Sequence, residues 1–188
     1  MRKFILLLLL AVGCGPHVRV EPTNPGHFHA DVDFNAEQMR RLEIAAETWN
    51  YYSNGISDLT VTQDLDTRNK LDMARKCVSG CLIHGDSADA DFVMMDSEHH
   101  DRLTLGVTTG IMHQTVKFAM DRLGNLEDLQ EVALHEFGHT FGMAHIPDKT
   151  AIMYQWHMVP GTKCPKQSDM FEFCRAKDCS IIQVQWCE

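Results

Sequence analysis

Residues 135–145 read HEFGHTFGMAH, and the spacing of their histidines decides how this part of the chain must fold. His135 and His139 are four residues apart, so on an α-helix their imidazoles share one face, where both can bind one metal ion. Glu136 directly follows the first histidine and can reach a metal-bound water without being a ligand itself. The stretch therefore predicts a helix with a metal site on one face.

Gly142 and His145 extend this pattern. Glycine tolerates a positive φ, so the helix can end at Gly142 and the backbone can turn sharply there. That turn would bring His145 back as a third ligand. Three histidines with one open coordination position are typical of a catalytic zinc site, because structural zinc sites use four protein ligands.

The sequence before the motif has the pattern that a helix requires. Apolar residues recur at helical spacing at Leu126, Leu129, Val132, Ala133 and Phe137. Asn125 is suited to cap the first turn, which also contains Asp128, and we expect a helix of about five turns. The alternative is an amphipathic helix with surface histidines and no metal, and the flanking sequence favours the metal site.

The full pattern, HExxHxxGxxH followed by a methionine, resembles the signature of the metzincins. The methionine is Met153 in the stretch AIMY, eight residues after His145, and this spacing is most similar to that of the matrixin branch. The resemblance implies an α/β (α+β) metzincin domain. Such a domain has a twisted mixed five-stranded sheet, a long active-site helix, a Met-turn and a short C-terminal helix.

The resemblance also implies the chemistry of a zinc endopeptidase. His135, His139 and His145 would bind one Zn²⁺, and Glu136 would act as general base toward the attacking water. Met153 would form an apolar floor beneath the histidines. The alternative is a catalytically silent, lipid-anchored metzincin-fold module for binding or adhesion. Degenerate members of that kind usually lose the glutamate or a histidine, and this chain keeps all four residues.

Two segments are expected to contact a protein or peptide substrate. The resemblance implies an edge strand to which an extended substrate adds through main-chain hydrogen bonds. The strand would be residues 105–109, with Leu105, Gly106 and Val107 as its substrate-binding residues. The segment 154–160 after the Met-turn would line the pocket for the side chain just past the cut. Its lining would include Tyr154, Trp156 and Met158, whose apolar character favours a hydrophobic side chain there.

Hydrophobic patterning predicts the remaining elements. Strands are expected at residues 28–33, 59–65, 90–95, 103–109 and 115–120, and the resemblance makes 90–95 the central strand. A helix is expected from Asn35, which forms a relative of the capping box with Gln38, to about Tyr52. Residues 66–89 are interpreted as an insertion, and residues 168–177 as a C-terminal helix.

The chain departs from the matrixin pattern in several ways. Ile146 follows the third histidine, where matrixins usually carry a serine. We recognise no pro-segment with a cysteine that could cap the zinc. The cluster that holds a second, structural zinc in animal matrixins is not reproduced, since His84-Gly85-Asp86 precedes the expected central strand. Six further cysteines also set the chain apart, and we interpret it as a divergent, bacterial member.

The first residues are typical of an export signal. Arg2 and Lys3 precede an apolar stretch that is too short to span a bilayer. The sequence AVGC, which ends at Cys14, resembles a bacterial lipobox, in which the cysteine carries lipid and anchors the protein to a membrane. The alternative is ordinary cleavage after Gly13. The expected division is a signal peptide at 1–13, a lipid-anchored tether at 14–26 and a metzincin catalytic domain at 27–188.

Cysteine parity favours lipidation of Cys14. The chain has 7 cysteines, so lipidation leaves an even number for disulfides in an oxidising compartment. We therefore expect a cell-envelope lipoprotein, at the outer membrane or cell surface, or otherwise a secreted protein. A local Cys77–Cys81 bridge with two more near the C-terminus is favoured, and other pairings stay open. A zinc site made of Cys164, Cys174, Cys179 and Cys187 is disfavoured by their spacing.

The net charge of −9 limits the expected partners. Proteins that bind nucleic acid present a basic face to the phosphates, so no nucleic acid partner is expected. The length after processing suits one domain, which we expect to act as a monomer. Asp86, Asp89 and Asp91 could collect Ca²⁺, although their spacing is not that of a known calcium loop.

Overall fold

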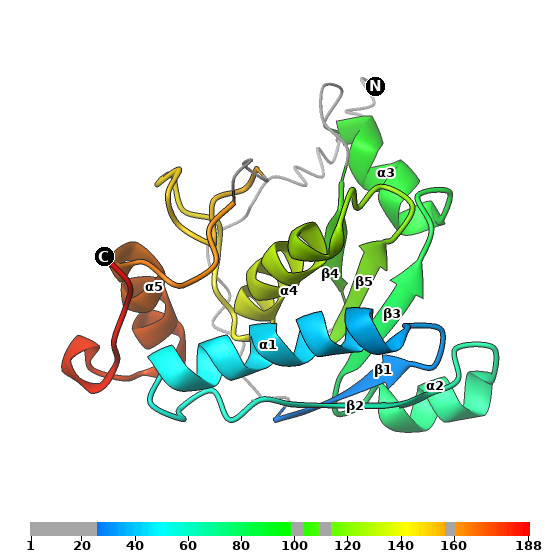
Figure 1. Ribbon diagram of the computed structural model, residues 1–188, viewed down its shortest axis with the longest axis horizontal. Helices are drawn as coiled ribbons and strands as arrows, with labels where there is room; N and C mark the ends of the chain where they lie inside the picture. Colours follow the sequence, from blue (N-terminus) through cyan, green and yellow to red (C-terminus); the bar gives the residue numbers. More distant parts are fainter. Residues whose placement is uncertain (1–25, 99–103, 110–113, 157–160) are drawn as a thin grey trace, which may run out of the picture.

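The computed structural model describes residues 26–98, 104–109, 114–156 and 161–188. Its sheet has five strands in the order β2-β1-β3-β5-β4 (Figure 1). The strands are β1 (His27–Asp31), β2 (Thr60–Leu65), β3 (Cys81–Gly85), β4 (Gly106–Thr109) and β5 (Thr115–Ala119). All neighbours are parallel except β4 and β5, which pair antiparallel. The expected mixed five-stranded sheet is confirmed, with β4 at its edge.

Helix α1 (Ala36–Tyr52) begins and ends where local sequence chemistry predicts. The Asn35 side chain accepts hydrogen bonds from the Glu37 and Gln38 amides at 3.0 and 2.9 Å, and the Gln38 side chain accepts one from the Asn35 amide at 2.8 Å. After the helix, Asn54 and Gly55 both have positive φ, which ends the helical path. The capping box is therefore complete.

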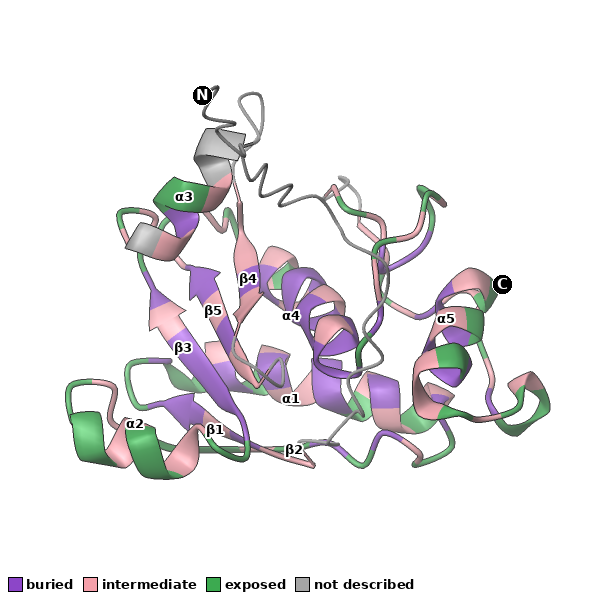
Figure 2. Ribbon diagram, turned by 180° about the vertical axis from the view of Figure 1, so that it is seen from behind, coloured by how far each residue is buried: buried purple, intermediate pink, exposed green. Residues whose placement is uncertain are grey.

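Helices α1 and α4 (Leu126–Thr140) pack against each other and against the sheet, as both views show (Figures 1 and 2). The Trp49 indole is fully buried and donates to the Leu134 carbonyl of α4 at 2.9 Å. The Phe137 ring of α4 lies 5.2 Å from the Phe28 ring of β1. Aromatic side chains thus fix α4 in place from beneath, because a large buried ring leaves little freedom to shift.

The expected central strand at residues 90–95 is wrong. These residues begin helix α3 (Ala90–Glu98), in which Phe92 is buried while Val93 and Met94 are 55% and 61% exposed. A short apolar run does not distinguish a strand from a helix by its periodicity, which explains the error. The strand between β1 and β5 is β3 instead, within the residues interpreted as an insertion. That segment also contains helix α2 (Lys70–Lys76).

The C-terminal region is held by disulfides. Helix α5 (Gln167–Lys177) is followed by a short 3-10 helix, η1 (Ile181–Gln183). The disulfides are Cys77–Cys81, Cys164–Cys187 and Cys174–Cys179. The favoured pairing is confirmed, and none of these sulfurs is left to bind a metal. In the described part of the chain, no helix is both long and apolar enough to cross a membrane.

Candidate metal centre

Helix α4 carries two of the candidate ligands, and local sequence chemistry determines where this helix begins and ends. Asn125 accepts hydrogen bonds from the Glu127 and Asp128 amides at 2.8 and 3.0 Å, as the sequence predicts. At the other end, Gly142 has a φ of +86°, a conformation that costs glycine little. The chain therefore leaves the helix there and returns toward it with His145.

The three histidines form a triangle of nitrogen atoms. Their Nε2 atoms are 3.1 Å apart between His135 and His139, 3.2 Å between His135 and His145, and 3.1 Å between His139 and His145. Three nitrogens bound at about 2.05 Å around a tetrahedral zinc would be about 3.3 Å apart. The triangle therefore fits one zinc ion, and the exposed His145 leaves it open to solvent.

Backbone carbonyls fix the orientation of two of these rings. The Nδ1 atom of His135 lies 2.7 Å from the Ile152 carbonyl, and that of His139 lies 3.0 Å from the Met143 carbonyl. A carbonyl oxygen can only accept, so each Nδ1 must carry the proton. This tautomer leaves the Nε2 lone pair directed toward the shared position, as a metal ligand requires.

Met153 is buried against α4 at Gly138, and its role as a floor beneath the histidines stays a prediction. It is fully buried, and a Cβ atom added to Gly138 of α4 would lie 2.2 Å from its sulfur. No side chain other than hydrogen fits at Gly138 without displacing the methionine. The packing of the Met-turn against α4 thus depends on a glycine between the first two histidines.

Asp169 is a buried carboxylate that sequence reasoning missed. It lies in the first turn of α5, is fully buried, and accepts hydrogen bonds from the Ile152 and Met153 amides at 3.0 and 2.9 Å. It also accepts one from the Lys166 amide at 2.8 Å. Because Ile152 in turn holds His135, Asp169 connects α5 to the metal centre through the Met-turn. An acidic residue near a helix start was the only available signal.

Glu136 points from α4 toward the edge strand. It is 5% exposed, and the Thr108 hydroxyl of β4 donates to its Oε2 atom at 2.6 Å. Burial raises the pKa of Glu136 to about 7, an effect that the Thr108 hydrogen bond partly offsets. A carboxyl with a pKa near neutrality, next to a metal position, is suited to accept and return a proton.

The predicted substrate-binding residues of the edge strand contact different parts of the molecule. Gly106 packs on α4, since an added Cβ would lie 2.7 Å from Val132 and 2.9 Å from Glu136. Val107 lies on the other face of the sheet with Phe92, so only its backbone can serve a substrate. Leu105 precedes the strand and packs against the main core.

The second predicted substrate-binding segment is only partly described. Tyr154 and Trp156 follow the Met-turn and are partly buried. Met158 and Cys14 lie outside the described residues. The substrate roles of these side chains stay predictions.

The aspartates considered for Ca²⁺ do not gather into a cation site. Lys117 forms ion pairs with Asp91 at 2.8 Å and with Asp89 at 3.5 Å, so a lysine already occupies this acidic group. Among the described residues, the histidine triangle is the only cluster of three or more potential metal ligands. The calcium expectation therefore finds no support.

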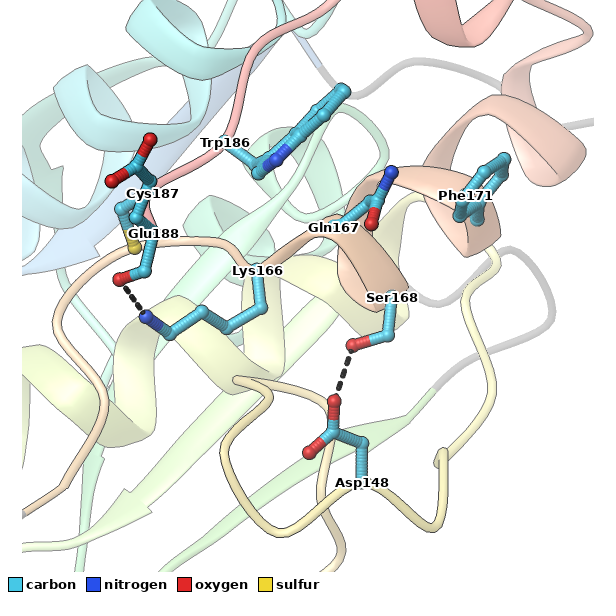
Figure 3. Close-up of a pocket in the computed structure, with 8 residues that line it drawn as sticks. All are labelled: Asp148, Lys166, Gln167, Ser168, Phe171, Trp186, Cys187 and Glu188. Atoms are coloured by element: carbon cyan, nitrogen blue, oxygen red, sulfur yellow. Dashed lines mark hydrogen bonds between the residues drawn. The ribbon is translucent and has the colours of Figure 1, made fainter.

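A hollow in the surface lies beside α5, away from the histidine triangle (Figure 3). Its volume is about 420 Å³, and its lining includes Lys166, Ser168, Phe171 and Trp186. Two hydrogen bonds cross it, from Lys166 to the Glu188 carbonyl and from Ser168 to the Asp148 carboxylate at 2.9 Å. None of the candidate ligands lines it.

Comparison with known proteins agrees with this geometry. The family model described as matrixin matches residues 19–171, which include the whole sheet, α4, the three histidines and the Met-turn. Among curated proteins, the same chain finds no match. The family implies a metalloprotease that depends on Zn²⁺. The chain belongs to the matrixin family of zinc metalloproteases.

Proposed function

We propose that this protein is a zinc endopeptidase that cleaves extracellular proteins, with Glu136 as its general base. The observation that carries the proposal is the combination of three Nε2 atoms within 3.2 Å of one another and a buried carboxylate on the next residue of the same helix. His135, His139 and His145 would hold the ion. Zinc, when bound, supplies a Lewis acid and lowers the pKa of a bound water.

Other residues of the chain would transfer the proton, position the carboxylate and orient the imidazoles. The Glu136 carboxylate takes the proton of the attacking water and returns it to the leaving amine. Thr108 holds that carboxylate at 2.6 Å, beside the edge strand. The Ile152 and Met143 carbonyls keep two imidazoles in the tautomer that can bind metal.

Strand β4 supports a mode of substrate binding. It pairs with β5 on one side only within the described residues, so its outer edge offers backbone groups to an extended peptide. Gly106 brings this edge against Glu136. A peptide added to β4 would thus run past the general base and the histidine triangle.

The direct test is chelator-sensitive proteolysis. Purified protein is incubated with denatured casein or gelatin, with and without a zinc chelator, and zinc is then added back. We expect cleavage that the chelator stops and zinc restores. A zinc-loaded preparation that cleaves neither these proteins nor a peptide library would contradict the proposal and favour a binding module.

The location outside the cell is a proposal that rests on the sequence. The anchor at Cys14 is tested by Cys14→Ser followed by membrane fractionation. We expect the variant to leave the membrane fraction, whereas an unchanged distribution would contradict lipidation. The monomeric state is tested by sedimentation of the soluble variant.

A further inference from the structure

Helix α2 and the turn after it carry two largely exposed aliphatic side chains. Leu71 is 77% exposed and Val78 is 69% exposed, and the burial view shows α2 at the rim of the molecule, mostly in the colour of exposed residues (Figure 2). Hydrogen bonds from the Cys77 amide to the Met73 carbonyl and from the Ser79 amide to the Lys76 carbonyl continue the helical path past the end of α2. Leu71 and Val78 are seven residues apart, close to two turns, so they point in similar directions.

The inner face of α2 is packed against the sheet. Met73 and Cys77, four residues apart, pack against a small core cluster that includes Ile83 of β3. Leu71 is two residues from Met73, so it lies about 160° away around the helix axis. The Cys77–Cys81 disulfide also joins the end of the helix to the start of β3. The helix is therefore held in the orientation that directs Leu71 outward.

Two cations accompany the exposed aliphatic side chains. Lys70 directly precedes Leu71, Arg75 follows it by four residues, and both cations are exposed. The acidic side chains around the helix pair with other cations: Arg68 with Asp66 and Asp33, and Lys76 with Asp72 and Asp64. Among the described residues, Lys70 and Arg75 take part in no such ion pair. The outer face of α2 (Lys70, Leu71, Arg75 and Val78) is therefore both apolar and cationic.

Helix α2 and helix α4 lie on opposite sides of the sheet. Leu82 of β3 packs into the main core, to which α1 and α4 contribute, whereas the next residue, Ile83, packs into the cluster under α2. Successive side chains of a strand point to opposite faces of the sheet, which separates the two helices (Figure 1). A surface bound through α2 therefore leaves the histidine triangle of α4 on the far side of the sheet.

We propose that the outer face of α2 docks on the anionic surface of a lipid membrane. Leu71 and Val78 enter the apolar boundary of the headgroup region, while Lys70 and Arg75 meet the lipid phosphates and lay their aliphatic stems beside the apolar side chains. The contact is separate from the proposed lipid at Cys14 and from the proposed peptidase activity. It holds the domain with its histidine triangle directed away from the bilayer.

Charge and size favour a membrane over a protein partner. The net charge of −9 repels an anionic surface, so the cationic face of α2 sets the orientation in which the chain can approach. Stable protein interfaces bury about 800 Å² on each partner and require complementary shapes. A helix of 7 residues with two aliphatic side chains offers little of either, whereas a fluid lipid surface adapts to the side chains that enter it.

The experiment measures cosedimentation with vesicles. The exported Cys14→Ser chain, which cannot carry the lipid, is mixed with phosphatidylcholine vesicles that contain about one third phosphatidylglycerol, and separately with pure phosphatidylcholine vesicles. We expect binding to the anionic vesicles alone, and release at high salt because the attraction is screened. In this background, Leu71→Ser and Arg75→Gln should each weaken binding by at least about fivefold.

Matched controls remove the same kinds of side chain elsewhere on the surface. Ile182 in η1 is an aliphatic side chain that is 89% exposed, and Lys149 is an exposed lysine before the Met-turn. Ile182→Ser and Lys149→Gln should leave vesicle binding unchanged. Because all four substituted residues are exposed, each variant should fold, which circular dichroism and zinc content check.

A second measurement locates the lipid contact on the chain. Tryptophan fluorescence of Leu71→Trp should be quenched by vesicles of brominated anionic lipid, and that of Ile182→Trp should not. The proposal is overturned if the Cys14→Ser chain stays in the supernatant with anionic vesicles, if it binds both kinds of vesicle equally, or if Leu71→Ser binds as the parent does. Self-association that Leu71→Ser abolishes, without vesicle binding, would assign this face to a second copy and overturn the membrane role.

Discussion

At the scale of single residues, the candidate centre is held by contacts that come from distant parts of the chain. The carbonyls of Met143 and Ile152 orient two histidines, and the Thr108 hydroxyl orients Glu136. Such supporting contacts limit the motion of the groups that react, and loss of one commonly lowers activity without removing the site.

Thr108→Val tests the hydroxyl that donates to Glu136. Valine keeps the shape but cannot donate, so the carboxylate loses a hydrogen bond of 2.6 Å. We expect kcat/KM to fall by about tenfold, the size expected for one charge-assisted hydrogen bond, while zinc content stays the same. Thr109→Val on the same strand is the control, and an equal loss in both variants would contradict a specific role for Thr108.

The pH dependence follows from the raised pKa of Glu136, which burial brings to about 7. A nearby divalent cation favours the carboxylate and would lower this value. A general base works only when deprotonated, so kcat/KM should fall as the pH falls through a value below 7. Zinc content is measured at each pH, and a kcat/KM that rises as the fully loaded enzyme is acidified would contradict the assignment.

The sequence could predict only those parts of the site whose residues lie close together along the chain. His135, Glu136 and His139 share one helix, so their spacing alone places them together. Thr108 and Asp169 lie 28 and 16 residues from their partners Glu136 and Met153, and nothing in the sequence between them reports the contact. They become visible only when the fold brings β4 and α5 against the metal helix.

At the scale of elements, the Met-turn is fixed between two helices. Gly138 of α4 receives the Met153 sulfur, and Asp169 of α5 accepts the Ile152 and Met153 amides. The turn thus has one apolar and one polar attachment. Because Ile152 also accepts from His135, a shift of α5 would be transmitted to a candidate ligand.

Asp169→Asn tests the polar attachment. The asparagine amide group would face backbone amides that now donate to a carboxylate, so at least one of these donors would lose its acceptor. We expect a loss of about 1–3 kcal/mol in the free energy of unfolding, measured with urea, together with weaker zinc binding. Asp178→Asn in the exposed cap of the same helix should cost little, and equal stability of the two variants would contradict the account.

Element prediction succeeded where capping and periodicity agree. The Asn35 box, the Asn125 cap and the turn at Gly142 combine side-chain chemistry with backbone conformation, and these boundaries are confirmed. Residues 90–95 carry an apolar run without such a combination, and β3 is a short buried parallel strand within a segment that lacks a strong strand pattern. In such segments, tertiary packing determines whether the chain forms a helix or a strand.

At the scale of the whole molecule, one disulfide joins the start of β3 to the end of α2, and two lie in the C-terminal region. Cys164–Cys187 closes a separation of 23 residues and attaches the C-terminus to the segment before α5. Cys77–Cys81 and Cys174–Cys179 close separations of 4 and 5 residues. A longer closed loop restricts the unfolded chain more, so the first bridge should contribute most to stability.

Removing one disulfide at a time tests this ranking of their contributions to stability. Replacing Cys164 and Cys187 with alanine should cost about 3 kcal/mol of unfolding free energy, compared with about 2 kcal/mol for Cys174 and Cys179. Urea unfolding of both double variants under non-reducing conditions measures the difference. A larger loss from the short Cys174–Cys179 loop would contradict the entropic argument.

The central claim is that one zinc ion, held by three histidines, acts together with Glu136 in peptide hydrolysis. The most direct measurement determines zinc content and peptide cleavage on the same preparations of wild type and Glu136→Gln. We predict one zinc per chain in both proteins, with cleavage in wild type and none in the variant, because the glutamine keeps the fold and cannot take a proton. Cleavage by zinc-loaded Glu136→Gln at a rate near that of wild type would contradict the claim.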